Sequence, residues 1–192
     1  MGIEFELKFL AEESVFDMLK QESDSWTAYD METAYYDTPD RRLRDLYWTL
    51  RRRFENGVSV CTLKTPAGGV GRNEFETLCG DIQEALPLLC SQGAPRELLD
   101  LTAGGITEVC GARFRRLAGQ VVLEDAQVEL ALDKGVLTGG GKTLPFVEVE
   151  VELKSGDPAA AVAYANLLAA RFSMRPERKS KYKRALTLAE QA

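Results

Sequence analysis

A period-2 alternation of apolar and charged residues is the clearest pattern in this chain, and it begins near the N-terminus. Residues 3–10 alternate apolar side chains with Glu4, Glu6 and Lys8. This spacing predicts a β-strand with one apolar face for the core and one charged face. Neighbouring carboxylates repel each other unless a cation lies between them, and either Lys8 or a divalent metal ion could be that cation. Taken alone, the segment also fits a strand whose charged face meets water.

Strand patterns recur along most of the chain, and short helical patterns separate them. The Asn56-Gly57 pair is a strong hairpin signal between two of the strands. Strands are predicted at 3–10, 31–38, 46–55, 58–65, 72–78, 107–117, 120–125, 127–134 and 143–153, and helices at 12–22, 81–90, 95–101 and 157–172, with a last helix after the basic segment 175–184. Eight or nine strands with local hairpin spacing predict an antiparallel barrel or a strongly curved sheet flanked by helices. The length favours a single domain over residues 1–192.

The charged face of the first strand is repeated on the later strands. The side chains at these alternating positions are Arg51 and Arg53, Lys64, Arg72, Glu74 and Glu76, Arg113 and Arg115, Glu129 and Asp133, and Glu148, Glu150 and Glu152. Rows of like charge on a strand are unfavourable unless cations or anions lie between them. One interpretation is that these charged faces form the outer, solvent-exposed surface of the sheet. The alternative, which we favour, is a barrel whose charged faces point inward, with acids that hold metal on one wall and basic residues that hold a polyanion on the other.

Composition narrows the function classes. The net charge of −6 argues against a nucleic-acid binder. Histidine is absent, which excludes histidine bases and zinc sites with imidazole ligands. The four cysteines form no Cys-x-x-Cys pair, so we expect reduced thiols in a cytoplasmic protein. We expect neither a signal peptide nor a membrane span, because no apolar run of the required length is present.

The segment 139–143 reads Gly-Gly-Gly-Lys-Thr and superficially matches a phosphate-binding loop. The glycine that this motif requires five residues before Gly141 is replaced by Val136, and a predicted strand follows instead of a helix. We therefore predict a hairpin loop.

In their order, these motifs resemble the CYTH family, also called triphosphate tunnel metalloenzymes. The resemblance spans nearly the whole chain. It rests on Glu4-x-Glu6-x-Lys8, Tyr35-Tyr36-Asp37-Thr38-Pro39-Asp40, Leu50-Arg51-Arg52-Arg53, Lys64, Arg72-x-Glu74-x-Glu76, Arg113-x-Arg115, Glu129-x-x-x-Asp133, Glu148-x-Glu150-x-Glu152 and Ser180-Lys181-Tyr182.

The resemblance implies an eight-stranded antiparallel β-barrel tunnel with flanking α-helices, which binds a linear triphosphate and acts on it with two Mg²⁺ or Mn²⁺ ions. The implied metal ligands are Glu4, Glu6, Asp133, Glu148, Glu150 and Glu152. The implied triphosphate contacts are Lys8, Arg51, Arg53, Lys64, Arg72, Arg113, Arg115 and Lys181. We count Lys8 among the catalytic residues, and Glu74, Glu76 or Glu129 could accept a proton from the attacking water.

Inorganic tripolyphosphate is the expected substrate, because the motifs supply phosphate and metal ligands but no evident platform for a nucleobase. Within the family, an adenylate cyclase or a thiamine-triphosphate hydrolase would share all of these residues. A non-catalytic module that binds polyphosphate or nucleotides is the alternative from another class. The expected partner is thus a small-molecule triphosphate, not a nucleic acid or a membrane, and a homodimer is only a base-rate expectation.

Overall fold

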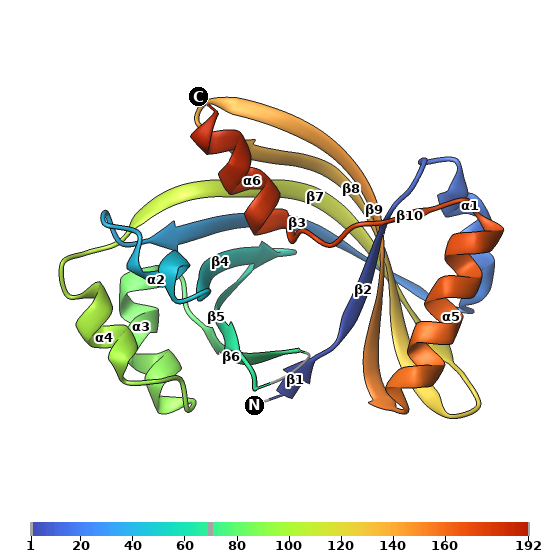
Figure 1. Ribbon diagram of the computed structural model, residues 1–192, viewed down its shortest axis with the longest axis horizontal. Coiled ribbons are helices and arrows are strands. Elements are labelled where there is room, and N and C mark those ends of the chain that lie inside the picture. The colour runs from blue at the N-terminus through green and yellow to red at the C-terminus, as the bar shows by residue number, and fades with distance from the viewer. Residues whose placement is uncertain (1, 69–70, 192) are drawn as a thin grey trace.

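The computed structural model describes residues 2–68 and 71–191, with side chains from residue 5 onward. Its strands form one antiparallel sheet in the order β1-β6-β5-β4-β3-β7-β8-β9-β2-β10, strongly curved in Figure 1. The strands are β1 (Gly2–Glu4), β2 (Glu6–Leu10), β3 (Trp26–Asp37), β4 (Thr49–Glu55), β5 (Val58–Pro66), β6 (Arg72–Leu78), β7 (Thr107–Val122), β8 (Ala126–Gly139), β9 (Lys142–Gly156) and β10 (Arg175–Pro176). The helices are α1 (Val15–Leu19), followed by a 3₁₀ turn (Lys20–Glu22), α2 (Arg42–Asp45), α3 (Ile82–Ser91), α4 (Glu97–Thr102), α5 (Pro158–Arg171) and α6 (Lys181–Glu190).

The N-terminal segment joins the two ends of this sheet. Only Phe5 separates β1 from β2, yet β1 pairs with β6 while β2 pairs with β9. The sheet therefore curves around on itself, although in the described part of the segment no residue pairs with both neighbours and the ladder is not closed. If β1 and β2 count as one strand and the two-residue β10 is set aside, the sheet has eight strands. The predicted mainly β, antiparallel fold is confirmed.

Two-residue turns set the register of two hairpins. Asn56 and Gly57 have φ values of 49° and 86° and connect β4 to β5, with Glu55 opposite Val58. The turn between β8 and β9 has the same character, because Gly140 and Gly141 have φ values of 55° and 74°. Left-handed conformations of this kind match the twist of a hairpin, and glycine adopts them without strain. Both hairpin predictions are confirmed.

Several predicted boundaries are wrong. The strands predicted at 107–117 and 120–125 are one strand, β7, because its pairing with β3 and β8 continues through Gly119. Small residues in this stretch interrupted the side-chain alternation but not the backbone ladder. Strand β3 begins at Trp26 instead of residue 31, and the short helix α2 was not predicted. In the predicted helix 12–22, only Val15–Leu19 is α-helical.

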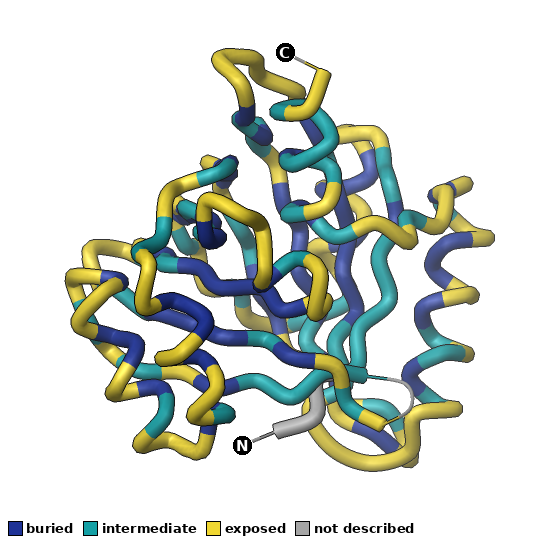
Figure 2. The backbone as a smooth tube through the Cα atoms, turned by 60° about the vertical axis from the view of Figure 1, so that its left-hand side comes forward, coloured by how far each residue is buried: buried dark blue, intermediate teal, exposed yellow. Residues whose placement is uncertain are grey.

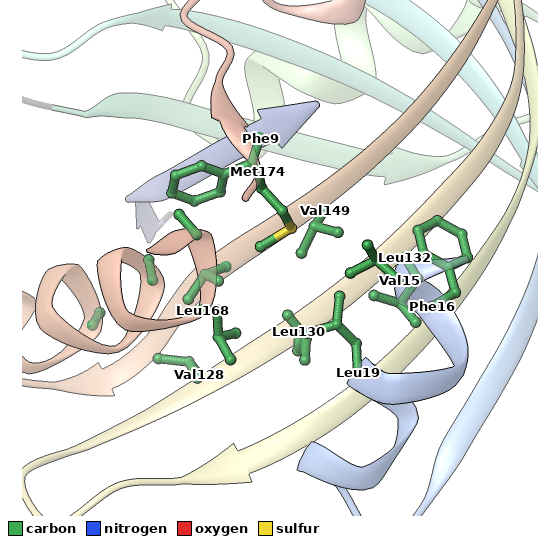
Figure 3. Packing of buried hydrophobic residues seen from close by; sticks show 14 residues of the cluster. Phe9, Val15, Phe16, Leu19, Val128, Leu130, Leu132, Val149, Leu168 and Met174 are labelled. Atoms are coloured by element: carbon green, nitrogen blue, oxygen red, sulfur yellow. The ribbon is translucent and has the colours of Figure 1, made fainter. Parts of the chain in front are cut away.

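Helices α1, α3, α4 and α5 cover the outer, apolar face of the sheet, whereas α6 lies on the inner face. In Figure 2, the helices alternate between buried and exposed residues, as expected when one side of a helix packs on the sheet. The largest core cluster joins α1 and α5 to β2, β8 and β9, and its side chains point toward one another in Figure 3. A second cluster joins α3 and α4 to β4, β5 and β6. Helix α6 packs across β7, β8 and β9. Within the described residues, no helix has the length and apolar character needed to cross a membrane.

Candidate active site

A cavity of about 560 Å³ lies within the curve of the sheet, and charged side chains line most of it. Ten basic and seven acidic residues face it, so the cavity is net positive in a chain whose overall charge is −6. Most of the residues singled out from the sequence are brought together here: Glu6, Lys8, Arg51, Arg53, Lys64, Arg72, Glu74, Glu76, Glu129, Glu150, Glu152 and Lys181. The strands therefore present their charged faces inward, as the alternation predicted.

Other predicted residues lie elsewhere. Asp133 and Glu148 are fully buried and do not line the cavity. Arg113 and Arg115 are exposed and do not line the cavity, and Arg113 pairs with Glu32 at 2.9 Å. Their assignment to phosphate stays a sequence-based prediction, and we leave both out of the proposed anion site because neither lines the cavity. Glu4 also stays a prediction, because its side chain lies outside the described part of the chain.

The cavity also contains basic residues that the sequence did not identify as site residues. The most informative is Arg116, which lines the cavity from β7 where Arg113 and Arg115 were expected. Lys154, Arg178 and Lys183 line it as well. In a run of consecutive arginines, alternation alone does not reveal which ones face inward. The basic segment 175–184 was the only sequence signal for the last two.

One side of the cavity is a basic wall, which consists of Arg51, Arg53, Lys64 and Arg72 on β4, β5 and β6. Glu74 lies within this wall, with its Oε1 3.1 Å from Lys64 Nζ and 3.4 Å from Arg51 Nη2. Cross-strand pairing of Lys64 with Glu74 produces this arrangement. Glu76 is more exposed, and its Oε1 accepts a hydrogen bond from the Thr62 hydroxyl at 2.9 Å. The wall thus mixes cations with two carboxylates that face the cavity.

Arg53 is buried in the basic wall, close to other cations. Burial lowers its pKa, and the like charges of Arg51 and Arg116 lower it further. The Arg53 and Arg116 guanidiniums lie 6.0 and 5.8 Å from the centre of the Phe114 ring. Arg53 Nε donates to the Thr33 hydroxyl at 3.2 Å. Cations that repel one another inside a cavity form a site that an anion would stabilise.

The opposite wall contains an acidic row, which consists of Glu6, Glu152 and Glu129 on adjacent strands β2, β9 and β8. Glu152 is directly opposite Glu6 on one side and Glu129 on the other. Two lysines border the row: Lys8 Nζ lies 2.8 Å from Glu6, and Lys154 Nζ lies 2.9 Å from Glu152. Burial tends to lower the pKa of Lys8, but Glu6 and Glu150 outweigh it, and the net pKa is raised.

Next to the acidic row, on the same strands β8 and β9, lies an acidic triad, which consists of Asp133, Glu148 and Glu150. One carboxylate oxygen from each residue lies within 4.8 Å of the others. The ammonium of Lys181 sits among them, 2.8 Å from Asp133 Oδ2, 2.6 Å from Glu148 Oε2 and 2.7 Å from Glu150 Oε1. Burial tends to lower the pKa of Lys181, but the three carboxylates raise it well above its ordinary value.

Two arginines complete this cluster. Arg116 Nε and Nη2 donate to the two Asp133 oxygens at 2.8 and 2.7 Å, and Arg116 also contacts Glu150. Arg184 on α6 contacts Glu148. Although burial raises the pKa of Glu150, Lys181 and Arg116 hold it well below its usual range. For Glu148, burial outweighs the attraction of Lys181 and Arg184, and the pKa is raised. Three acids and three bases thus balance in charge, and Lys181 and Arg184 hold α6 against the sheet.

Comparisons with known proteins agree with this architecture. The CYTH domain model matches residues 2–186. An inorganic triphosphatase from Haemophilus influenzae is 28% identical over 127 residues, which are 64% of this chain and 36% of that protein. The chain thus aligns with about a third of the length of that curated relative.

Solved structures share the fold at low sequence identity. The PH1819 protein from Pyrococcus horikoshii has a TM-score of 0.67 at 23% identity, with 98% of this chain and 99% of that chain covered. HpAC1 from Hippeastrum, regarded as an adenylyl cyclase and described by its dominant triphosphatase activity, has a TM-score of 0.67 at 19% identity, with 100% and 96% covered. The family model, the curved antiparallel sheet and the charged cavity together show that the chain belongs to the CYTH domain family.

Proposed function

We propose that this protein hydrolyses a linear triphosphate in a metal-dependent reaction, with inorganic tripolyphosphate as the first choice of substrate. The observation that carries this proposal is the convergence of Arg51, Arg53 and Arg116 on one cavity, where burial lowers the pKa of Arg53 and the like charges of the other two lower it further. A triphosphate supplies several negative charges over a length suited to such a wall. Guanidinium groups suit phosphate because their planar N–H fork can donate two parallel hydrogen bonds to two oxygens of one phosphoryl group.

The residues present fit divalent metal ions. The acidic triad offers three carboxylates, and Glu148 Oε2 is a buried oxygen without a well-formed hydrogen bond among the described residues, although Lys181 Nζ is near it. Glu6 and Glu152 offer a second pair of oxygen donors that face the cavity. Mg²⁺ and Mn²⁺ take oxygen ligands of this type. When bound, such ions would neutralise phosphate charge and lower the pKa of a water molecule.

The chain's own residues bind the substrate, stabilise its charge and accept a proton. The basic wall and Arg116 hold the triphosphate and stabilise charge on the transferring phosphoryl group and on the pyrophosphate leaving group. Lys8 lies between Glu6 and Glu150 in the acidic wall, where its ammonium can reach a phosphate oxygen. Glu129 lies in the acidic row, opposite the proposed metal ligand Glu152, and is our choice for accepting the proton of the attacking water. Glu74 and Glu76 instead contact Arg51 of the basic wall.

The relatives support hydrolysis over the alternatives. One is named an inorganic triphosphatase, and HpAC1 is described by a dominant triphosphatase activity. The adenylyl cyclase description of HpAC1 keeps cyclisation of ATP as the second candidate. We also propose that the protein acts in the cytoplasm on a small-molecule substrate.

A substrate panel tests the proposal. The purified protein is incubated with tripolyphosphate, ATP or thiamine triphosphate, each with Mg²⁺, Mn²⁺ or EDTA, and the products are identified by ion chromatography. We expect pyrophosphate and phosphate from tripolyphosphate, and no turnover in EDTA. Cyclic AMP as the main product of ATP would replace hydrolysis with cyclisation, and binding without turnover of any substrate would favour a non-catalytic module.

The matched variants are Glu152→Gln, which removes one carboxylate from the acidic row, and Glu32→Gln, which removes an exposed carboxylate outside the cavity. Glu152→Gln should require at least tenfold more Mn²⁺ for half-maximal turnover, whereas Glu32→Gln should match the wild type. An unchanged metal requirement in Glu152→Gln would exclude the acidic row as a metal site.

A further inference from the structure

The centre of the acidic triad, where a metal ion would have to bind, is filled by an ammonium group of the chain itself. Lys181 Nζ contacts all three carboxylates at 2.6–2.8 Å. Oxygen ligands bind Mg²⁺ at about 2.1 Å, so an ion that uses these oxygens needs the same space. The ammonium and a divalent ion therefore cannot occupy the triad together.

The charge balance leads to the same conclusion. The acidic triad carries three negative charges, and Lys181, Arg116 and Arg184 carry three positive charges. Addition of a divalent ion without the loss of a cation would leave two uncompensated positive charges in a buried cluster, which is strongly unfavourable. One cation must therefore move when an ion binds.

Lys181 is the cation best placed to move. Arg116 is fixed by two parallel hydrogen bonds to Asp133, at 2.8 and 2.7 Å. Lys181 instead carries a single ammonium on a flexible four-carbon stem, and its side chain borders the cavity.

We propose that Lys181 competes with the divalent ion for the acidic triad, so that ion binding displaces its ammonium into the cavity, where it contacts the triphosphate. This inference rests on the proposed metal dependence and deepens it. The displacement couples the two ligands: the ion releases a phosphate contact, and the phosphate stabilises the released ammonium. Each ligand should therefore strengthen binding of the other by the same factor.

The first test measures Mn²⁺ affinity without substrate, by titration with detection of free Mn²⁺, for wild type, Lys181→Met and Lys183→Met. Lys183 lies on the same turn of α6 and lines the cavity, and it makes none of the ion pairs described for the triad, so its variant matches the loss of charge. Lys181→Met should bind Mn²⁺ at least tenfold more tightly than wild type, and Lys183→Met should change less than threefold. An affinity of Lys181→Met that is unchanged, weaker or absent would overturn the inference.

A second measurement uses the wild-type protein alone, in case Lys181→Met does not fold. Acylation of lysine amines, read by mass spectrometry, reports how accessible each ammonium is. Because the Lys181 side chain is only 7% exposed, it should react slowly without an ion and several times faster with saturating Mn²⁺, whereas Lys183 should react at the same rate in both cases. A Lys181 rate that Mn²⁺ does not change would contradict displacement.

These outcomes separate the inference from the proposed function. Metal-dependent turnover by the wild type, with no gain in Mn²⁺ affinity for Lys181→Met, would overturn the inference alone. A gain in affinity without turnover of any triphosphate would overturn the proposed function and leave the competition between Lys181 and the ion in place.

Discussion

Replacement of Arg53 by methionine should stabilise the free protein while it weakens triphosphate binding. Arg53 is buried and is repelled by Arg51 and Arg116. The Arg53 and Arg116 guanidiniums lie beside one ring, so they are no more than about 12 Å apart. At an effective dielectric constant of about 20, that separation gives at least about 1.4 kcal/mol of repulsion. Methionine is long, unbranched and apolar, so it can fill much of the same space.

The favourable contacts of Arg53 contribute less free energy than is lost through two effects together, namely this repulsion and the burial of the charge. Its hydrogen bond to the Thr33 hydroxyl contributes about 1 kcal/mol. Its contact with Glu55, at 3.4 Å and partly exposed, contributes at most about 1 kcal/mol. With the repulsion from Arg51 added, we expect Arg53→Met to raise the free energy of unfolding by about 1 kcal/mol. Loss of a charge-assisted hydrogen bond to phosphate should weaken tripolyphosphate binding by about 1.5–3 kcal/mol, or roughly 10- to 150-fold.

Urea denaturation followed by circular dichroism measures the first effect, and calorimetric titration with tripolyphosphate measures the second. Arg113→Met is the control, because Arg113 is exposed and its partner Glu32 is also exposed. Both quantities should stay within about 0.5 kcal/mol of wild type in the control. Two results would refute the assignment of Arg53 to an anion site. One is a loss of more than about 1 kcal/mol in the free energy of unfolding of Arg53→Met, and the other is tripolyphosphate binding by this variant as tight as in wild type.

Three further predictions concern the frame of the site. Asp37→Asn should lower the free energy of unfolding in urea by about 1–3 kcal/mol, because the buried carboxylate accepts backbone N–H groups at the start of α2; a loss below 0.5 kcal/mol would contradict this role. Gly57→Ala should cost about 1 kcal/mol because of its φ of 86°, whereas Gly68→Ala, where the added methyl meets nothing within 4 Å, should not; equal losses would be inconsistent with turn strain. Burial raises the pKa of Cys61 to about 11 and of Cys110 to about 12, so at pH 8 a thiol reagent should modify these two more slowly than the partly exposed Cys79 and Cys90 in the native protein. Equal rates for all four cysteines would argue against this burial.

Much of the fold follows from local patterns in the sequence. Alternation identified most strands and correctly assigned the inward face of β4, β6 and β9, since each carries one charged face and one apolar face. The Asn56-Gly57 turn fixed one hairpin register, because few residue pairs adopt its left-handed conformations without strain. The division of the N-terminal strand between β6 and β9 was not predictable, since it depends on how the distant ends of the sheet meet.

The site was harder to predict at the level of individual residues. Across residues 113–116, alternation allows either Arg113 and Arg115 or Arg116 to face the cavity. Only the pairing of Arg116 with Asp133 across β7 and β8 determines that Arg116 does so. The position of Lys181 within the acidic triad was also beyond the sequence, because it depends on how α6 packs against β7, β8 and β9. Motifs thus identified the types of residue in the site, and tertiary packing determined their partners.

The most direct test of the central claim is the fate of oxygen from water during turnover. Tripolyphosphate is incubated with the protein and Mn²⁺ in ¹⁸O-labelled water, and the products are analysed by mass spectrometry. Metal-assisted attack of water on the terminal phosphorus predicts equal amounts of pyrophosphate and phosphate, with one ¹⁸O in the phosphate, and no reaction in EDTA. Label in the pyrophosphate, or the same rate in EDTA, would contradict the account.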